Sequence, residues 1–417
     1  MRVRVLLIGG GGREHAIGWS LARSPQVTEL ISLPGNPGLA ELGAVVEGVA
    51  ATDVGAVAAL ARVHSVDLVV VGPEAPLAAG LVDAISRLGI PVFGPTRSAA
   101  RLESSKAFAK DVMIRAGVPT SGAWVFEDRD SAAAHVNGHP GPYVVKADGL
   151  AAGKGVLVTE ERAAALAWVD RCFEGGFGPA GNRVVIEEYL SGPEVSVFAV
   201  SDGTDAITLE PARDYKRLLD GDEGPNTGGM GSFSPVELPV GLVEQVRQEI
   251  ILPVLRTMAA DANPYVGFIY AGLVLTPEGP KVIEFNARLG DPETQVVLPR
   301  LQTDLVEVIQ AALAGHITSL ELDWSPRSAV NVVLAAGGYP DNPRSGDRIR
   351  GLPVTDDDVL VFHAGTTRDD AGRLVTSGGR VLSVVGMGDT IDDARSRAYA
   401  ATEGIRFDGK QNRSDIG

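Results

Sequence analysis

Residues 143–159 read YVVKADGLAAGKGVLVT and form two β-rich runs around a glycine-rich loop. The loop is not a Walker A phosphate loop, because three residues separate Gly149 from Gly153 and a glycine follows Lys154. It also lies between two strands, whereas a Walker A loop precedes a helix. A hairpin of this kind can act as a flap whose backbone N–H groups and Lys154 cover the phosphates of a nucleotide. A flexible hairpin tip without a ligand is the alternative.

Charged residues flank this hairpin in apolar surroundings. Lys146 lies in the apolar run YVVKA, and a buried lysine needs an anionic partner, either a nucleotide phosphate or a carboxylate. Further on, Glu187, Glu188 and Leu190 follow another apolar run, and Glu194 comes after a turn. Such a strand end can offer backbone groups to adenine and a carboxylate to ribose hydroxyls. Acidic strand ends without a ligand are also common.

The first hundred residues alternate short apolar strands with helical stretches, which predicts a parallel α/β sheet. The first strand runs into GGGGREH at 9–15, where glycines let the backbone approach an anion at a helix N-terminus. A nicotinamide dinucleotide fits poorly, because the third glycine of its fingerprint falls at Glu14 or His15. In addition, Pro34-Gly35-Asn36 replaces the usual acidic residue. We favour a phosphate or phosphosugar here, and a purely structural turn is the alternative.

Two further motifs lie in the second half of the chain. The strand KVIEFN at 281–286 places Glu284 and Asn286 on one face. Their oxygens suit Mg²⁺, which is usually held by one or two protein ligands together with phosphate oxygens. Arg288 and Asp291 follow directly. The polar stretch 211–235 contains GPNTGGMG, whose glycines allow a backbone to wrap a ligand; a disordered surface loop is the alternative.

The remaining pattern predicts an α/β and α+β multidomain protein. Helices are expected at 104–120, at 243–261 with a kink at Pro253, at 304–315 and at 391–401. We expect three domains. They are an N-terminal parallel α/β domain at 1–103, a middle domain at 104–325 with a mobile lid at about 121–190, and a small C-terminal α+β domain at 326–417.

Composition narrows the function. The 417 residues include 53 acidic and 37 basic ones, and the net charge of −16 argues against nucleic acid or an anionic membrane as partner. Cys172 is the only cysteine, so no intrachain disulfide can form. No apolar run could span a bilayer and no signal-peptide pattern is present, so we expect a cytoplasmic protein. No G-x-S-x-G elbow or H-E-x-x-H motif occurs. Seven of the 37 basic residues are lysines, which makes each informative: Lys106, Lys110, Lys146, Lys154, Lys216, Lys281 and Lys410.

Taken in order along the chain, several motifs resemble the phosphoribosylamine–glycine ligase family of ATP-grasp enzymes. These are GGGGREH, GPEAPL, KADGLAAGKGV, DGDEGPNTGGMG, KVIEFNARLGDPETQ and SDIG. The resemblance implies a pre-ATP-grasp N-terminal domain, an ATP-grasp domain with a lid, and a small C-terminal domain. It also implies that ATP converts glycine to an acyl phosphate, which 5-phosphoribosylamine attacks to give glycinamide ribonucleotide in purine (IMP) biosynthesis. Such chemistry needs positioning and charge neutralisation rather than a protein nucleophile.

The resemblance also implies roles for individual residues. The ATP site would consist of Lys106, Lys146, Gly153, Lys154, Glu187, Glu188, Leu190 and Glu194. Glu284 and Asn286 would hold Mg²⁺ or Mn²⁺, and Lys146, Asp214 and Arg288 would be catalytic. Glycine and 5-phosphoribosylamine would be bound by Gly11, Gly12, Glu14, Asn36, Glu74, Asp214, Lys216, Asn226, Thr227, Arg288 and Asp291.

The chain departs from the family pattern at four places, one of which is its ending at 411–417, a looser form of the family's tail. Tyr215 stands where the family usually has histidine, and Leu289 where phenylalanine is commoner. Residues 271–276 lack the carboxylate that many ATP-grasp enzymes carry on the strand before E-x-N. Another ATP-grasp ligase or carboxylase, acting for example on bicarbonate, is the first alternative, and a nucleotide-regulated binding protein is the second. We expect a monomer that contacts the preceding purine-pathway enzyme transiently.

Overall fold

The computed structural model describes residues 2–151 and 154–417, and its N-terminal part is a five-stranded parallel sheet. The strand order is β3-β2-β1-β4-β5, and every neighbouring pair is parallel, as predicted. The strands are β1 (Val3–Gly9), β2 (Val27–Pro34), β3 (Ala44–Val45), β4 (Leu68–Val71) and β5 (Val92–Phe93). Helix α1 (Gly12–Ala22) begins directly after β1, so the glycines at 9–12 lie at the carboxyl edge of the sheet.

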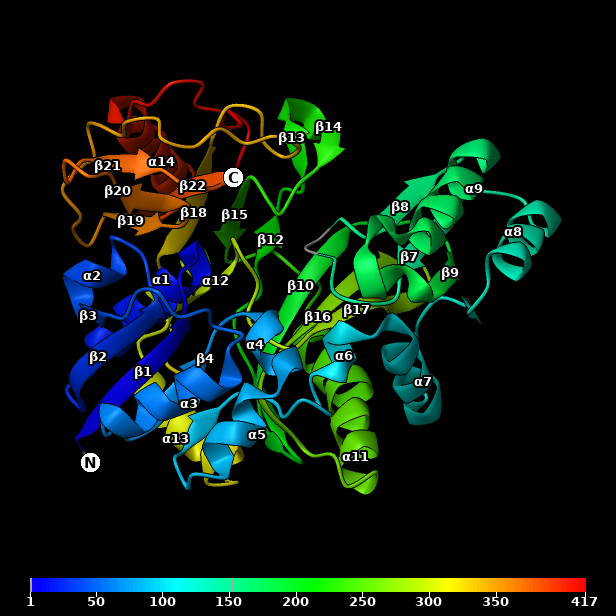
Figure 1. Cartoon of the computed structure of the whole chain (residues 1–417), viewed down its shortest axis with the longest axis horizontal. Coiled ribbons are helices and arrows are strands. Elements are labelled where there is room, and N and C mark those ends of the chain that lie inside the picture. The colour runs from blue at the N-terminus through cyan, green and yellow to red at the C-terminus, as the bar shows by residue number, and fades with distance from the viewer. Residues whose placement is uncertain (1, 152–153) are drawn as a thin grey trace.

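An antiparallel sheet with the order β11-β10-β16-β17 forms the centre of the molecule (Figure 1). Its strands are β10 (Glu194–Gly203), β11 (Ala206–Thr208), β16 (Tyr265–Thr276) and β17 (Gly279–Asn286). Helices α7 (Lys106–Ala116) and α13 (Leu305–Leu313) lie where helices were predicted. Near Pro253, the helical stretch widens to a π-turn at Arg247–Ile251 before α11 (Leu252–Ala260), because proline has no N–H to donate within a helix.

A separate lobe projects from this centre (Figure 1). Its four-stranded sheet has the order β6-β9-β7-β8, with helices α8 (Arg129–Gly138) and α9 (Arg162–Arg171). The strands are β6 (Ala123–Phe126), β7 (Tyr143–Ala147), β8 (Val156–Thr159) and β9 (Val184–Glu188). Strands β7 and β8 are the two runs predicted around the glycine-rich loop. The lobe has a hydrophobic cluster of its own, which includes Val145, Val169 and Ile186, so its core does not depend on the central sheet.

The C-terminal sheet has the order β12-β15-β18-β22-β19 and is covered by α14 (Ile391–Gly404). Strands β18 (Ser328–Ala335), β19 (Val359–His363) and β22 (Arg380–Gly388) were predicted. Strands β12 (Arg213–Asp214) and β15 (Gly231–Ser234) were not, because the stretch 211–235 was expected to be a loop. The structure instead pairs Gly231 with Val332, about a hundred residues away, a register that no local pattern encodes. A further hairpin, β13 (Arg217–Leu219) and β14 (Glu223–Asn226), lies between them.

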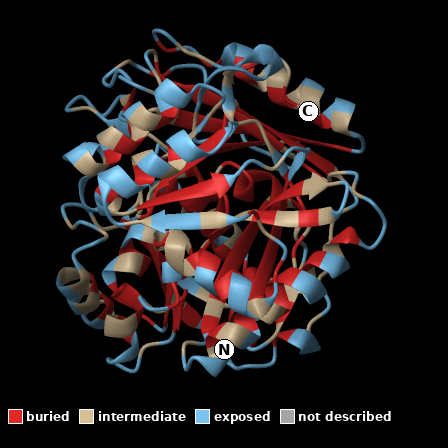
Figure 2. Cartoon of the chain, turned by 90° about the vertical axis from the view of Figure 1, so that its right-hand side faces the viewer, coloured by how far each residue is buried: buried red, intermediate tan, exposed pale blue. Residues whose placement is uncertain are grey.

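The buried residues are concentrated in the strands of the sheets (Figure 2). The interior strands are almost wholly buried, whereas most helices keep one exposed face. Hydrophobic clusters join the N-terminal sheet to the central one, for example through Phe93 and Phe268, whose rings meet edge to face at 4.9 Å. Across the described ranges, no helix combines the length and apolar character needed to cross a membrane.

Candidate active site

A buried carboxylate on the lobe holds two lysines. Glu187, on β9, lies 2.9 Å from Lys146 Nζ and 3.0 Å from Lys110 Nζ. Burial opposes ionisation of Glu187, but the charges of Lys146 and Lys110 lower its pKa. The carboxylate alternative for the partner of Lys146 is therefore present in the structure. Lys110, to which no role was assigned from the sequence, is the second lysine paired with Glu187.

The donors of the two lysines are used differently. Lys110 Nζ also donates to Thr120 Oγ1 at 2.7 Å and to Ser121 Oγ at 2.8 Å, so its three N–H groups are engaged. Lys146 Nζ donates to Glu187 and to Ile283 O at 3.1 Å, which leaves one N–H for a further acceptor among the described contacts. Lys110 thus orients Glu187, and Lys146 keeps a donor for the cleft.

The glycine-rich loop is tied to the start of α7. Asp148 accepts hydrogen bonds from Ala107 N at 2.7 Å and Ser105 Oγ at 3.2 Å, and it is paired with Arg183. Lys106 Nζ donates to Gly149 O at 3.2 Å, and burial lowers the pKa of Lys106. At the far end of the loop, exposed Lys154 donates to Pro340 O in the C-terminal unit at 3.3 Å. Gly153, a predicted ATP ligand, lies outside the described residues.

The predicted adenine and ribose residues lie at the end of β9 and the start of β10. Glu188 is exposed and accepts a hydrogen bond from Gly122 N at 3.0 Å. Leu190 is half-buried in the turn between the strands. The Glu194 carboxylate is 2.5 Å from Lys216 Nζ, so it bridges the predicted nucleotide and acceptor residues.

Glu284 and Asn286 lie on the same face of β17, as predicted, and Asn286 Nδ2 donates to Glu284 Oε1 at 3.3 Å. Burial opposes ionisation, but the charges of Lys216, Lys146 and Lys106 lower the pKa of Glu284, so the carboxylate is ionised at neutral pH. Opposite Glu284 on β16 lies Gly272, where a Cβ atom would stand 3.2 Å from Glu284 Cγ. A side chain at position 272 would press on Glu284, so the glycine leaves room for this carboxylate.

This pair fits a divalent cation of the Mg²⁺ type. An ionised carboxylate and a side-chain amide oxygen are hard donors, and two protein ligands suffice when phosphate oxygens complete the shell. In the part of the chain that the structure describes, no group of three His, Cys, Asp or Glu side chains could hold a metal. The pair therefore suits a metal that arrives with a nucleotide better than a permanent all-protein site.

A second group of carboxylates lies beside Lys216. Burial raises the pKa of Asp214, with the Lys216 charge opposing. Burial and the neighbouring Asp214 charge raise the pKa of Glu293 to about 7. Ser196 Oγ lies 3.4 Å from Glu293 and donates to Tyr270 OH at 2.8 Å. Glu293 was not among the predicted site residues, because the sequence does not show which carboxylates are brought together.

Arg288, which follows β17, pairs with two carboxylates of the N-terminal part of the chain. Its guanidinium lies 3.2 Å from Glu74 and 2.9 Å from Glu103, and these opposite charges raise its pKa despite burial. Glu103 was not predicted. The neighbouring N-terminal loop is closed on itself, since Glu14 accepts from Gly11 N at 2.8 Å and pairs with Arg13 at 2.5 Å. A Cβ atom on Gly12 would meet Gln295 Nε2 at 2.7 Å, so this glycine allows a close approach.

Side chains of the C-terminal unit, the part of the chain around β18, β19 and β22, contact the GPNTGGMG segment. Arg380 donates to Asp291 O at 2.7 Å and pairs with the Asp291 carboxylate at 3.1 Å, and it also donates to Gly228 O. Tyr339 OH accepts from Gly228 N at 2.9 Å. Thr227, which was predicted to bind substrate, donates to Lys216 O at 2.8 Å, and the equally predicted Asn226 is exposed on β14. Arg380 and Tyr339 carry no motif, so only the structure identifies them.

Asn36 links the N- and C-terminal units. Its Nδ2 donates to Gly10 O at 2.9 Å and to His363 O at 2.8 Å, and its Oδ1 accepts from Gly38 N and Leu39 N. His15 Nδ1 accepts from His363 N at 2.7 Å, and burial together with His363 lowers the pKa of His15 to about 3. The polar atoms of the Asn36 amide are thus engaged in holding this junction.

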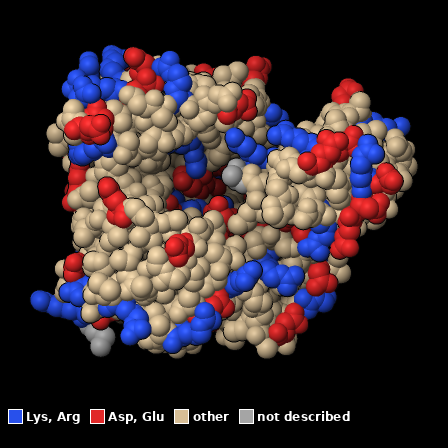
Figure 3. All heavy atoms as spheres, viewed as in Figure 1, with Lys and Arg blue, Asp and Glu red and all other residues tan. Residues whose placement is uncertain are grey.

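Figure 3 shows a hollow between the lobe and the N- and C-terminal units, in which charges of both signs gather. Three family models match most of the chain, one after the other. The phosphoribosylglycinamide synthetase N domain matches residues 3–103, its ATP-grasp (A) domain 104–294 and its C domain 329–417. The chain belongs to the phosphoribosylglycinamide synthetase family. Its three-part architecture and its ATP-grasp centre are those of the family.

Individual relatives agree with the assignment to the phosphoribosylglycinamide synthetases. The phosphoribosylamine–glycine ligase of Caulobacter vibrioides is 52% identical over 419 aligned residues, which cover 100% of this chain and 98% of that protein. The crystal structure of the phosphoribosylamine–glycine ligase from Thermotoga maritima matches with a TM-score of 0.87 at 37% identity, covering 100% of both chains. The biotin carboxylase domain of the 2-oxoglutarate carboxylase from Hydrogenobacter thermophilus shares the fold. It has a TM-score of 0.75 at 16% identity and covers 99% of this chain and 92% of that one.

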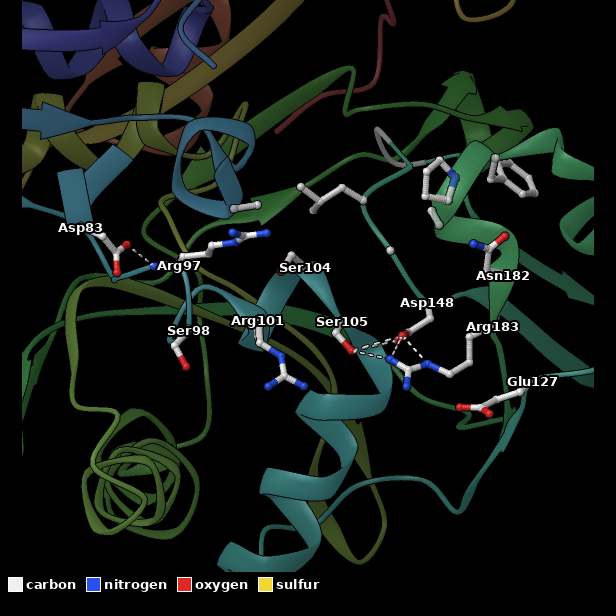
Figure 4. A pocket seen from close by; sticks show the side chains of 16 residues that line it. Asp83, Arg97, Ser98, Arg101, Ser104, Ser105, Glu127, Asp148, Asn182 and Arg183 are labelled. Atoms are coloured by element: carbon white, nitrogen blue, oxygen red, sulfur yellow. Dashed lines mark hydrogen bonds and ion pairs between the residues drawn. The ribbon is translucent and has the colours of Figure 1, made fainter. Parts of the chain in front are cut away.

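This member of the synthetase family also contains a large cavity. It has a volume of about 1170 Å³ and is shared by the N-terminal unit, α7 and the lobe (Figure 4). Arg97 and Arg101 point into it, and the Asp148–Arg183 pair forms its wall. Its described lining does not include Lys146, Glu187 or Glu284. The cavity includes the start of the glycine-rich loop in its lining but is not the place where Lys146, Glu187 and Glu284 meet.

Proposed function

We propose that the protein ligates glycine to 5-phosphoribosylamine, with ATP converted to ADP and phosphate, and so forms glycinamide ribonucleotide in purine (IMP) biosynthesis. The observation that carries the proposal is the meeting of Lys106, Lys146 and Lys216 around Glu284 in a chain 52% identical to a named ligase. We propose further that it acts in the cytoplasm as a monomer, with small-molecule partners, and contacts the preceding pathway enzyme only transiently.

The nucleotide would lie between the lobe and β17. The free N–H of Lys146, the Lys106 ammonium and the loop carrying Lys154 would donate to its phosphates, and Glu188, Leu190 and Glu194 would meet adenine and ribose. Because Lys110 holds Glu187 in place, Lys146 is oriented before ATP arrives, which lowers the cost of positioning. Residues 121–190, the proposed lid, would close over ATP. We expect ATP to slow proteolysis at 149–155.

Glu284 and Asn286 would hold Mg²⁺ or Mn²⁺, which when bound neutralises charge on the transferring phosphoryl group. The Arg288 guanidinium would bind the glycine carboxylate or the charge that develops as it attacks the γ-phosphorus. Glycyl phosphate would form and ADP would leave. Arg288 is held by Glu74 and Glu103, so its guanidinium is fixed before the reaction and needs little reorganisation.

The acceptor amine would then attack the glycyl carbonyl, and phosphate would leave. This amine must lose a proton, and Asp214 and Glu293, beside Lys216, are two carboxylates with raised pKa values. The pKa of Glu293, at about 7, suits proton transfer at neutral pH. The 5-phosphoribosylamine would lie against the N-terminal loop. Its proposed contacts there are Gly11, Gly12, Glu14, Asn36 and Glu74, and Lys216, Asn226, Thr227 and Asp291 are proposed to line the remainder of the acceptor side.

The test is ADP release by the purified protein with Mg²⁺ and freshly prepared 5-phosphoribosylamine. We expect release only when glycine is also present, and glycinamide ribonucleotide as the product by mass spectrometry. Release with bicarbonate but not with glycine would instead identify a carboxylase. No release with any acceptor, together with measurable ATP binding, would identify a binding protein.

A further inference from the structure

The largest fully buried side chain of the described chain is that of an arginine, Arg413, which is 1% exposed. Its guanidinium forms two parallel hydrogen bonds with the Asp415 carboxylate, at 2.7 and 2.6 Å. It also donates to Asp222 Oδ1 at 2.7 Å and to Arg217 O at 3.2 Å. Burial of an arginine is costly, so a fold keeps one where directional bonds fix a geometry that apolar packing would leave loose.

These bonds tie residues 411–417 to the β13–β14 hairpin, which projects beside the C-terminal unit (Figure 1). Asp415 accepts from Gly221 N at 2.9 Å, and Ser414 N donates to Asp220 Oδ1 at 2.8 Å. The hairpin has only seven paired or flanking strand residues and an exposed β14, so it cannot be held by a core of its own. The hydrogen bonds from residues 411–417 hold the hairpin in place of a core.

The same tail also contacts Tyr215, which lies between the predicted site residues Asp214 and Lys216. The Arg413 guanidinium lies 4.8 Å from the centre of the Tyr215 ring, and Gly417 N donates to Tyr215 OH at 3.2 Å. Tyr215 also packs against the hydrophobic cluster of the C-terminal unit. In an extended segment, neighbouring side chains alternate between faces. Tyr215 faces the tail, whereas Asp214 and Lys216 face Glu194 and Glu284 in the cleft.

From these contacts we propose that Arg413 is a positioning residue for the acceptor side of the active site. It clamps Tyr215 and the β13–β14 hairpin from behind, and thereby sets the positions of Asp214 and Lys216. The inference rests on the proposed function for the identity of the acceptor, but the clamp itself is a statement about geometry. It also gives a reason for tyrosine at 215, since its ring and hydroxyl are both used by the tail.

The variant that tests the clamp is Arg413→Met, which keeps most of the side-chain volume. The carboxylates left behind, Asp222 and Asp415, have side chains 60% and 35% exposed, so water can solvate them and the fold should survive. We expect the KM values for glycine or 5-phosphoribosylamine to rise about tenfold or more, with the KM for ATP within twofold. Amide hydrogen exchange should accelerate over 214–226. Arg413→Lys should recover part of the loss, because it keeps the charge but not the two parallel bonds.

Arg373→Met is the matched control, because Arg373 is an exposed arginine of the same unit that pairs with Asp369. It should change neither KM nor exchange. Unchanged acceptor KM in Arg413→Met, or a uniform change in all three KM values with faster exchange throughout, would overturn the proposal. If Arg413→Met does not fold, Tyr215→Phe and Asp415→Asn must show the same selective pattern. If the wild type does not turn over glycine, the proposed function fails, and exchange over 214–226 still decides the clamp.

Discussion

The two sides of the cleft are built in different ways. On the nucleotide side, Lys106, Lys110, Lys146 and Glu187 come from one stretch of about eighty residues. Within it, Glu187 pairs with Lys110 and Lys146, and Lys106 donates to Gly149 O. On the acceptor side, Arg288 meets Glu74 and Glu103, and Asp291 meets Arg380. These residues come from all three parts of the chain. The ion pairs of the nucleotide side are thus formed within one stretch of the chain, with single hydrogen bonds from Lys146 to β17 and from Lys154 to the C-terminal part. The ion pairs of the acceptor side exist only when the three parts of the chain are assembled.

This difference predicts which perturbations act locally and which act on the assembly. Substitutions on the nucleotide side should affect ATP and the lobe and leave the acceptor contacts intact. Substitutions on the acceptor side should raise the KM for glycine or 5-phosphoribosylamine and loosen the junction between the N- and C-terminal units. They should have little effect on the KM for ATP.

The largest effect is expected where the two sides meet. Glu284→Ala should lower kcat by about a thousandfold or more at ordinary Mg²⁺, because it removes the charged donor proposed for the metal. The melting temperature should change little. Steady-state kinetics and calorimetry check this, with Glu278→Ala at the exposed tip of the same hairpin as control. Near wild-type rates in Glu284→Ala would refute the metal role.

Glu187→Ala tests whether the nucleotide side is self-contained. The substitution leaves Lys110 and Lys146 buried without their carboxylate, and loss of one partner of a buried ion pair typically costs about 3–5 kcal/mol. We expect the lobe to unfold first, visible as fast hydrogen exchange confined to 121–190, and a raised KM for ATP. Glu160→Ala, at an exposed carboxylate of the same lobe that is not assigned to the site, is the control. Exchange that spreads into the N-terminal sheet would contradict the comparison.

Arg288→Lys tests the assembled side. A lysine cannot bridge Glu74 and Glu103 as the planar guanidinium does, so the acceptor KM should rise by about a hundredfold while the KM for ATP stays within twofold. Initial-rate kinetics measure both constants. The control is Arg115→Lys, at an exposed arginine that also bridges two carboxylates. A parallel rise in both KM values would show that the two sides are not separable.

The smallest effect concerns the junction between the N- and C-terminal units. Because the pKa of His15 is about 3 in the folded protein, its ring stays neutral where the unfolded chain, with a pKa of 6.5, binds a proton. The free energy of unfolding should therefore fall as the pH drops from about 6.5 towards 3. His15→Gln should flatten this dependence in denaturant titrations, and His316→Gln, at an exposed histidine, should not. An unchanged slope in His15→Gln would show that this contact does not limit acid stability.

Much of the fold was predictable because its signals are local. The alternation of apolar strands and helices predicted the parallel sheet, and β7, β8, β16 and β17 are strong β patterns bounded by glycine or proline. The pairing of Glu284 with Asn286 on one face follows from the two-residue period of a strand. The stretch 211–235 was missed, because β12 and β15 are strands only in the company of β18. Because β12 and β15 lie within 104–325 but belong to the C-terminal sheet, the numerical boundaries of the three domains stay predictions.

The sequence by itself determined the family, the chemistry of the donors and the places where glycine lets backbone approach a ligand, since these depend on residue type and spacing. Tertiary structure alone decided the partners. It placed Lys110 with Glu187, Glu103 with Arg288, and Arg413 behind Tyr215. Charges of this kind act over a few ångströms, and the residues concerned are tens to hundreds of positions apart. Which of them meet is therefore set by the packing of the units and not by any local pattern.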